Sequence, residues 1–251
     1  MKKIALITGA TAGIGAALAD RFAREQYALI ITGRREERLN NLADRLKHEY
    51  QAAVLPLKFD IRERKAVEEE MDSLPEEWKN IDVLVNNAGL AVGMNSIHEG
   101  EIDDWERMID TNVKGLLYIS RKVMPWMTER KTGHIINIGS IAGTQTYPKG
   151  NVYCASKHAV DSLSKAMRAD LLPYGIRVTQ VRPGLVETEF SLVRFKGDEE
   201  KAEKVYQGYQ PLKPEDIAEV AYYATTLPKH VTLNDIEVTP TVQANSFVKN
   251  I

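Results

Sequence analysis

A tyrosine, a lysine and a serine form the pattern in this sequence with the clearest chemistry. Tyr153 and Lys157 are four residues apart, which places both side chains on one face of a helix. A phenol ordinarily ionises at about pH 10, and a nearby ammonium group lowers its pKa. The hydroxyl of Ser140, thirteen residues upstream, could hold a substrate oxygen beside the phenol. These groups predict general acid–base chemistry at a carbonyl or alcohol carbon, although the spacing of Tyr153 and Lys157 also arises by chance.

A glycine cluster near the N-terminus supports that interpretation. Gly9, Gly13 and Gly15 follow the apolar segment Ile4–Thr8 and open a helical pattern. Glycines in this position permit a tight turn and let backbone N–H groups approach a pyrophosphate, which the helix N-terminus attracts. The sequence therefore predicts a dinucleotide-binding turn.

Two arginines at the end of the next apolar segment favour NADP over NAD. Arg34 and Arg35 follow Ala28–Thr32, and the first acid after them is Glu36. An acid at the end of this strand would bind a ribose 2′-hydroxyl, whereas guanidinium groups pair with a 2′-phosphate. The alternative is that both arginines begin a solvated helix.

Short apolar segments alternate with charged amphipathic segments along the chain. The predicted strands are Ile4–Thr8, Ala28–Thr32, Ala53–Phe59, Val83–Asn86, His134–Ile138, Arg177–Val181 and Asp235–Val238. The predicted helices are about Ile14–Arg24, Glu36–Tyr50, Glu63–Leu74, Asp103–Arg130, Val152–Leu172 and Pro214–Thr225, with the fourth kinked or ended early by Pro125. This alternation predicts an α/β protein with a doubly wound Rossmann fold, in which helices cover both faces of a seven-stranded parallel sheet. We find no linker or repeat that would divide residues 1–251, so we expect one domain.

Residues 188–211 interrupt the alternation and are predicted to form a substrate loop or lid. They follow a strand's carboxyl end, where α/β proteins place binding loops. For the charged residues Asp198–Lys204 alone, a solvated surface helix is the favoured interpretation. Arg194 could bind a substrate carboxylate through two hydrogen bonds, with a surface ion pair as the equal alternative.

Seven motifs in this order resemble the classical short-chain dehydrogenase/reductase family over nearly the whole chain. They are Thr8–Gly15 (T-G-x-x-x-G-x-G), Asp60, Asn86–Gly89 (N-N-A-G), Asn112, Ser140, Tyr153 with Lys157, and Pro183–Gly184 with Thr188. The resemblance implies a catalytic tetrad. Tyr153 would exchange the proton, Lys157 would lower its pKa and bind the nicotinamide ribose, Ser140 would orient the substrate oxygen, and Asn112 would hold a water through a local break in its helix.

The resemblance also implies the residues that contact ligands. The expected cofactor contacts are Gly9, Thr11, Gly13, Ile14, Gly15, Arg34, Arg35, Asp60, Asn87, Ala88, Gly89, Tyr153, Lys157, Pro183, Gly184, Val186 and Thr188. The expected substrate contacts are Ser140, Tyr153, Gln145 and Arg194, with Tyr147 and Val186 as further pocket residues.

The C-terminal third narrows the expected activity. Glu187–Ser191, Arg194–Asp198, Leu212–Ala218 and Asn234–Glu237 resemble the branch of NADP-dependent 3-hydroxy acid and serine dehydrogenases. This implies hydride transfer between NADP(H) and a short 3-hydroxy acid or a β-hydroxy amino acid such as serine. The alternatives are a broad-specificity carbonyl or 3-oxoacyl reductase and a non-catalytic NADP sensor. A sugar-nucleotide epimerase is disfavoured, because those enzymes have the glycine spacing T-G-x-x-G-x-x-G.

Composition excludes several partners. The 33 basic and 35 acidic residues give a net charge of -2, which offers no basic field for nucleic acid and no polybasic membrane anchor. A single cysteine, Cys154, permits no intrachain disulfide and favours a reducing compartment, so we expect a cytoplasmic protein. We interpret Cys154 as a packing residue. The five histidines show no metal-ligand spacing, and we expect no metal. The family resemblance implies a homotetramer.

Overall fold

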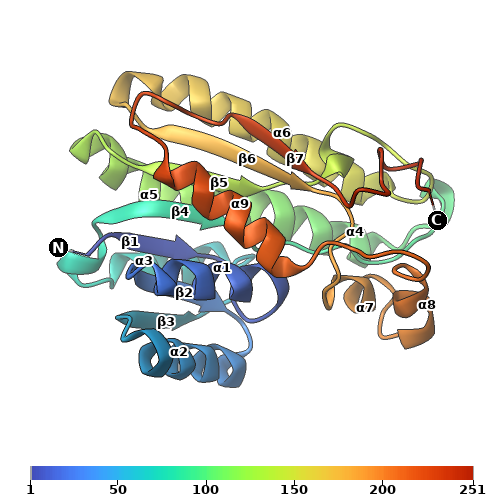
Figure 1. Ribbon diagram of the computed structural model, residues 1–251, viewed down its shortest axis with the longest axis horizontal. Helices are drawn as coiled ribbons and strands as arrows, with labels where there is room; N and C mark the ends of the chain where they lie inside the picture. The colour runs from blue at the N-terminus through green and yellow to red at the C-terminus, as the bar shows by residue number, and fades with distance from the viewer. Residues whose placement is uncertain (1, 251) are drawn as a thin grey trace.

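A seven-stranded parallel sheet forms the centre of the molecule in a computed structural model that describes residues 2–250 (Figure 1). Its strands are β1 (Ile4–Ile7), β2 (Ala28–Gly33), β3 (Val54–Lys58), β4 (Ile81–Asn86), β5 (His134–Ile138), β6 (Arg177–Pro183) and β7 (Asp235–Val238). The strand order is β3-β2-β1-β4-β5-β6-β7, and every neighbouring pair is parallel. The order reverses direction between β1 and β4, which opens a crevice at their carboxyl ends. The predicted fold class is confirmed.

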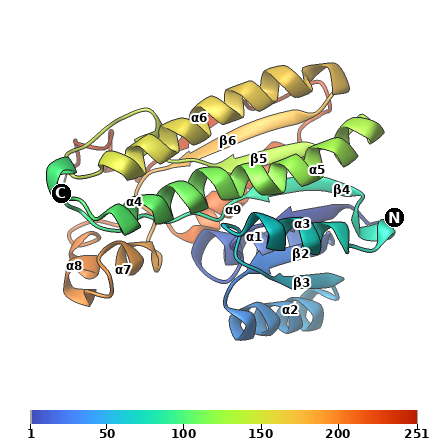
Figure 2. The same ribbon diagram turned by 180° about the vertical axis from the view of Figure 1, so that it is seen from behind.

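Helices cover both faces of this sheet (Figures 1 and 2). On one face, α1 (Gly13–Arg24), α2 (Glu36–Tyr50) and α9 (Pro214–Thr226) enclose one buried cluster. On the other face, α3 (Arg64–Asp72), α5 (Leu116–Arg130) and α6 (Asn151–Leu171) enclose a second cluster. The central strands of the sheet are therefore buried on both faces, whereas β7 at one edge is partly exposed.

Strand residues alternate between the two clusters, as the continuous apolar segments predicted. In β1, Ala5 and Ile7 belong to the first cluster, whereas Ile4 and Leu6 belong to the second. Successive side chains in a strand point to opposite faces, so a strand covered on both faces must be apolar throughout. This burial makes β1 a rigid base for the turn that follows it.

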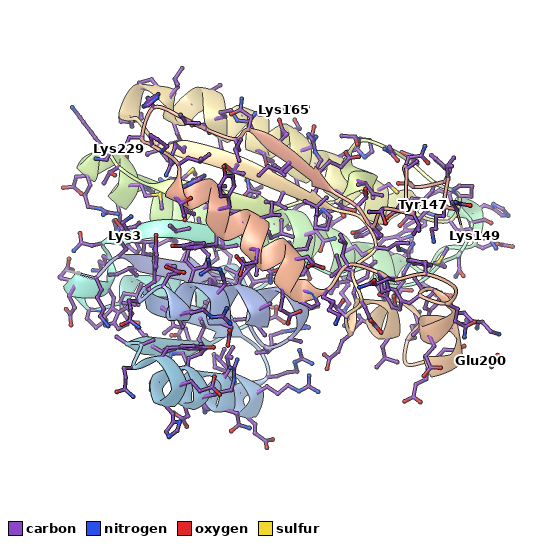
Figure 3. All side chains as sticks on the ribbon, viewed as in Figure 1. Lys3, Tyr147, Lys149, Lys165, Glu200 and Lys229 are labelled. Carbon is purple, nitrogen blue, oxygen red and sulfur yellow. The ribbon has the colours of Figure 1, made fainter. Side chains whose placement is uncertain are left out.

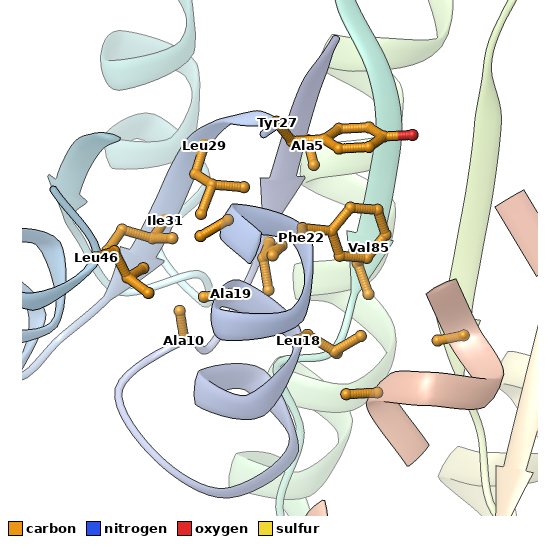
Figure 4. Close-up of a cluster of buried hydrophobic side chains, with 14 of the residues drawn as sticks. Ala5, Ala10, Leu18, Ala19, Phe22, Tyr27, Leu29, Ile31, Leu46 and Val85 are labelled. Atoms are coloured by element: carbon orange, nitrogen blue, oxygen red, sulfur yellow. The ribbon is translucent and has the colours of Figure 1, made fainter. Parts of the chain in front are cut away.

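Phe22 anchors α1 against the sheet (Figure 4). Its fully buried ring packs edge-to-face with Tyr27 and Tyr222, at centroid distances of 5.0 and 5.5 Å. Leu18, on the same helix, is also fully buried. Packing of this face fixes where α1 begins, and hence the position of the glycine turn.

One predicted helix is divided in the structure. The expected helix Asp103–Arg130 consists of α4 (Ile102–Ile109), a π-helical segment (Asp110–Gly115) and α5. Of the two outcomes expected at Pro125, a kink or an early end, the early end is wrong, because α5 continues to Arg130. Val123 and Met127 are fully buried on either side of Pro125, and this packing holds the helix together across the missing N–H group.

The predicted lid contains two short helices, α7 (Phe190–Arg194) and α8 (Glu199–Lys204). Residues 239–250, which follow β7, run to the same end of the molecule as these helices in both views (Figures 1 and 2). The sequence patterns did not predict this return. No helix of residues 2–250 is long and apolar enough to cross a membrane.

Candidate active site

A cavity of about 540 Å³ opens at the carboxyl ends of the strands. All the predicted cofactor residues line it, from Gly9 in the turn after β1 to Thr188 after β6. Ser140 and Arg194 line it as well. The parallel sheet explains this convergence, because turns that follow parallel strands emerge at one edge.

The turn between β1 and α1 leaves backbone exposed to the cavity. Gly9 has φ +68°, and a Cβ there would lie 2.8 Å from the Cα of Ala88. A Cβ on Gly15 would lie 2.2 Å from the carbonyl oxygen of Gly9. Ala12, at the N-cap of α1, provides no side-chain acceptor for the first N–H groups of the helix. Those groups are therefore available to an anion such as a pyrophosphate.

Thr8 and Asn87 hold the turn against the end of β4. The Thr8 hydroxyl oxygen accepts hydrogen bonds from the backbone N–H groups of Asn87 and Ala88, both at 3.0 Å. In return, the Asn87 amide donates to the carbonyls of Thr8 and Gly9 at 2.9 and 3.2 Å. The Asn87 side chain thus shapes the cofactor turn from within the protein.

The two predicted arginines take different partners at the edge of the cavity. Arg34 lies 3.5 Å from the Asp60 carboxylate, which also accepts two-pronged hydrogen bonds from Arg62. Burial alone would raise the pKa of Asp60, but the hydrogen bonds from Arg62 outweigh it and hold that pKa below its usual value. Arg35 donates to the Thr11 hydroxyl at 3.0 and 3.1 Å.

Arg35 also shares an acid with Arg38, which the sequence analysis missed. The Glu189 carboxylate lies 2.8 Å from Arg35 and 2.6 Å from Arg38. Hydrogen bonds from both arginines lower the pKa of Glu189. Arg38 follows Arg35 by three residues at the start of α2. This spacing places the two side chains on one face of the helix, and it could have predicted that they share a partner. The start of the lid is thereby bound to Arg35 and Arg38, which together with Arg34 we call the arginine cluster.

Tyr153, Lys157 and Ser140 meet in the middle of the cavity wall. Tyr153 and Lys157 are buried near the start of α6, and Ser140 follows β5. The Ser140 hydroxyl forms a hydrogen bond that favours the Tyr153 phenolate, while its oxygen accepts from the Ala142 N–H at 3.1 Å. The Lys157 ammonium donates to the Ile138 carbonyl at 3.0 Å.

Asn112 lies in the π-helical segment, where the sequence analysis placed a local break. Its amide bonds both the N–H and the carbonyl of Leu90 at 2.8 Å and donates to Ser156 at 2.9 Å. A Cβ on Gly89 would meet the Asn112 side-chain oxygen at 3.3 Å and the Lys157 ammonium at 3.5 Å. Both groups therefore border the space that the missing side chain of Gly89 leaves open. Asn112 itself does not line the cavity.

Arg194 occupies the other end of the cavity, beside Tyr147. Its guanidinium donates to the Tyr147 hydroxyl at 2.8 Å and lies 5.6 Å from the centre of the Tyr153 ring. Figure 3 shows Tyr147 at the same end of the molecule as residues 239–250. Gln145, which was expected to touch substrate, does not line the cavity, and its side-chain oxygen accepts from the Ser246 N–H at 2.7 Å.

Residues 3–198 match the family model described as short chain dehydrogenase. The chain belongs to this family. It is 52% identical over 242 residues to the NADP-dependent 3-hydroxy acid dehydrogenase of Escherichia coli K12, covering 96% of each protein. It is 46% identical to sulfoacetaldehyde reductase 2 of Chromohalobacter salexigens, covering 97% of this chain and 96% of the relative. A solved structure of serine dehydrogenase in its closed form with NADP+ is 50% identical, covers 99% of both chains and superposes with a TM-score of 0.93.

Burial dominates the electrostatics of the tyrosine and lysine in this short chain dehydrogenase. It raises the pKa of Tyr153, a shift that the Ser140 hydrogen bond and the Arg194 charge only partly oppose. It lowers the pKa of Lys157 to about 8. The pKa of the Tyr153 phenol is thus raised, whereas the sequence analysis expected Lys157 to lower it. The physical reason is that desolvation disfavours both charged forms, and the ammonium is bound to the Ile138 carbonyl.

Other side chains near this site serve packing. Cys154 is buried in a cluster with Leu90 and Met108, in agreement with its interpretation as a packing residue. His158 bonds the carbonyl of Cys154 through its Nδ1 at 2.8 Å and does not line the cavity. Among residues 2–250, no group of three or more His, Cys, Asp or Glu side chains could hold a metal ion.

Replacement of Lys157 by methionine should make stability depend differently on pH. Because the folded pKa is about 8 and the unfolded pKa is about 10.4, the unfolded state binds more protons between these values. As pH rises through this window, the free energy of unfolding of the wild type should therefore increase relative to that of Lys157→Met by roughly 3 kcal/mol. Urea unfolding at several pH values measures the difference. A difference in the free energy of unfolding that does not change with pH would contradict burial of the Lys157 ammonium.

Proposed function

We propose that the chain is an NADP-dependent dehydrogenase that acts on the alcohol of short 3-hydroxy acids or of β-hydroxy amino acids such as serine. The observation that carries this proposal is one cavity that joins an arginine cluster, a Ser140–Tyr153–Lys157 site and Arg194. The NADP-dependent 3-hydroxy acid dehydrogenase and the serine dehydrogenase, at 52% and 50% identity over nearly the full chain, support it.

The residues around the cavity fit NADP. Cβ atoms at Gly9 and Gly15 would fill the cradle at the start of α1, so both glycines serve close backbone approach. Arg34 and Arg35 would bind the 2′-phosphate, and Asp60 would contact the adenine. When bound, NADP supplies the partner for hydride exchange. The protein supplies position, proton transfer and exclusion of water.

Tyr153 would exchange the proton of the substrate oxygen. During alcohol oxidation its phenolate accepts that proton, and during carbonyl reduction its phenol donates one. Ser140 holds the same oxygen by a hydrogen bond. Lys157, as an ammonium, favours the phenolate, while Asn112 holds a water that connects Lys157 to solvent. The position of Asn112 and Lys157 on either side of the space at Gly89 supports this relay.

Arg194 would bind the substrate carboxylate. It lies within 5.6 Å of the Tyr153 ring and already donates to Tyr147, so its planar group faces the reacting end of the cavity. The relative named sulfoacetaldehyde reductase supports an anionic substrate, because a sulfonate needs a similar partner. This charge favours hydroxy acids over the uncharged ketones of a broad carbonyl reductase.

We further propose that residues 1–251 form a single domain and that residues 188–211 close over the substrate. We also propose that the protein is a homotetramer located in the cytoplasm. Exposed Ile102 and Leu117, on α4 and α5, support burial of this helical surface between subunits. The single cysteine supports a reducing compartment.

Replacing Arg35 by alanine should weaken NADP binding at least roughly tenfold, because a charge-assisted hydrogen bond is lost. NAD binding should change less than about twofold, since NAD has no 2′-phosphate. Cofactor fluorescence titration measures both. Arg45→Ala, on the same helix but bound to Asp20 and Glu49, is the matched control. Tighter binding of NAD than NADP by the wild type would overturn the cofactor assignment.

Tyr153→Phe should reduce turnover by roughly 10²–10⁴-fold, because the phenol is the proton-transfer group. NADP affinity should stay within about twofold of wild type, since the glycine turn and arginines are untouched. Steady-state kinetics and titration separate the two effects. Near-normal turnover would exclude the mechanism, and exposed Tyr223→Phe should behave as wild type.

Arg194→Ala should raise KM for 3-hydroxybutyrate roughly tenfold, because a carboxylate loses its charged partner. KM for methyl 3-hydroxybutyrate, the uncharged ester, should change less than about twofold. The experiment is a kinetic screen of both compounds with serine, threonine isomers and 3-hydroxypropionate, using NADP. An equal effect on acid and ester would exclude carboxylate recognition, and preference for neutral ketones would favour a carbonyl reductase.

A further inference from the structure

The chain after β7 forms a wall of the same cavity. The side-chain oxygen of Gln243 accepts a hydrogen bond from the Leu185 N–H at 3.0 Å. A Cβ on Gly184 would lie 2.3 Å from that oxygen, so the absence of a side chain at Gly184 permits the contact. Gln243 and Lys249 both line the cavity. This wall therefore stands beside Pro183–Gly184, the segment expected to flank the nicotinamide.

Internal hydrogen bonds give this segment a defined shape. The side-chain oxygen of Asn245 accepts from the N–H groups of Phe247 and Val248, both at 2.8 Å. Backbone bonds join Asn250 to Val242 at 2.9 Å and form a short bridge between Gln243 and Lys249. We call residues 239–250 the C-terminal turn. Gln145 fixes it from the body of the protein through Ser246.

Lys249 brings a positive charge to the cavity from the C-terminal turn. Its ammonium lies 5.5 Å from the centre of the Tyr209 ring, and the side chain is partly buried. Burial lowers its pKa, and no carboxylate of residues 2–250 contributes an opposing shift. Ser246, three residues earlier, has a buried hydroxyl without a hydrogen-bond partner in the described chain. This wall therefore presents a cation and a free hydroxyl.

The acids that line the cavity are already neutralised. Asp60 is paired with Arg34 and Arg62, and Glu189 is paired with Arg35 and Arg38. These pairs lie at the arginine cluster, whereas Lys249 lies with Gln243 beside the segment at Gly184. Among residues 2–250, no carboxylate forms an ion pair with Lys249, and a positive charge in a partly dehydrated wall attracts an anion more strongly than one in open solvent.

We propose that Lys249 is a specificity-determining residue that binds the anionic group of the substrate together with Arg194. The proposal rests on the hydroxy-acid function proposed above and deepens it. Arg194 and Lys249 both bring positive charge to the cavity, and the two acids among its described lining residues, Asp60 and Glu189, are paired, which favours a substrate whose net charge is negative. A 3-hydroxy acid without an amino group has such a charge, whereas the ammonium of serine offsets its carboxylate. Lys249 therefore favours simple 3-hydroxy acids over serine.

Lys249→Gln tests this role, because glutamine keeps a polar side chain and removes the charge. KM for 3-hydroxybutyrate should rise roughly tenfold with kcat within about twofold. KM for serine should rise less than about threefold, and KM for methyl 3-hydroxybutyrate should stay within about twofold. Lys249→Arg should recover most of the affinity for the acid. Lys229→Gln, an exposed lysine far from Tyr147 in Figure 3, is the control.

The outcomes separate this proposal from the function on which it rests. If the wild type does not oxidise 3-hydroxy acids with NADP, the proposed function fails. If the wild type does so and Lys249→Gln keeps the same KM, the role of Lys249 is wrong. An equal rise for acid, ester and serine would also overturn it, because that pattern reports a disturbed C-terminal turn. An unchanged dissociation constant for NADP in each variant verifies that the cofactor site is intact.

Discussion

The close approach of the turn after β1 to the end of β4 is the constraint on which the rest of the site depends. Gly9 and Gly15 have no room for a Cβ atom, and the Thr8 hydroxyl and Asn87 amide complete the contact by hydrogen bonds. Buried β1 and the Phe22 face of α1 hold this turn from behind. The same apolar core that stabilises the sheet therefore keeps a strip of backbone N–H groups directed at a phosphate.

Burial also sets the protonation of the tyrosine and lysine in the active site. Tyr153 and Lys157 are both taken out of water, which raises the pKa of the phenol and lowers that of the ammonium to about 8. Each shift moves the pair toward its neutral forms. Groups that restore charge are therefore placed nearby: Ser140 bonds the phenol, and Arg194 lies over the same ring. Under the proposed function, an anionic substrate beside Arg194 would weaken that cation's effect on the pKa of Tyr153, which would couple the charge of the substrate to proton transfer.

Much of the fold and of the cofactor site could be predicted from the sequence, because both depend on local patterns. Strands buried on two faces are continuous apolar segments, and parallel strands bring their carboxyl-end turns to one edge. The contacts that escaped prediction join distant segments. Glu189 meets Arg38 across about 150 positions of sequence, and Gln145 binds Ser246 although it was expected to touch substrate. The local pattern left open whether Pro125 would kink the helix or end it, and α5 continues past it with Val123 and Met127 fully buried on either side.

These distant contacts place two segments from different parts of the sequence around the cavity. The lid is attached at its start, where Glu189 bonds the arginine cluster, and between α7 and α8, where Lys196 pairs with Asp104 at 2.7 Å. The C-terminal turn is attached through Gln243 and Ser246 instead. Under the proposed function, the glycine turn and the tyrosine site carry out the reaction, whereas these two segments contact the substrate. Neither segment contributes to the two buried clusters of the sheet, so substitutions in the lid or the C-terminal turn would leave the packing of the sheet intact.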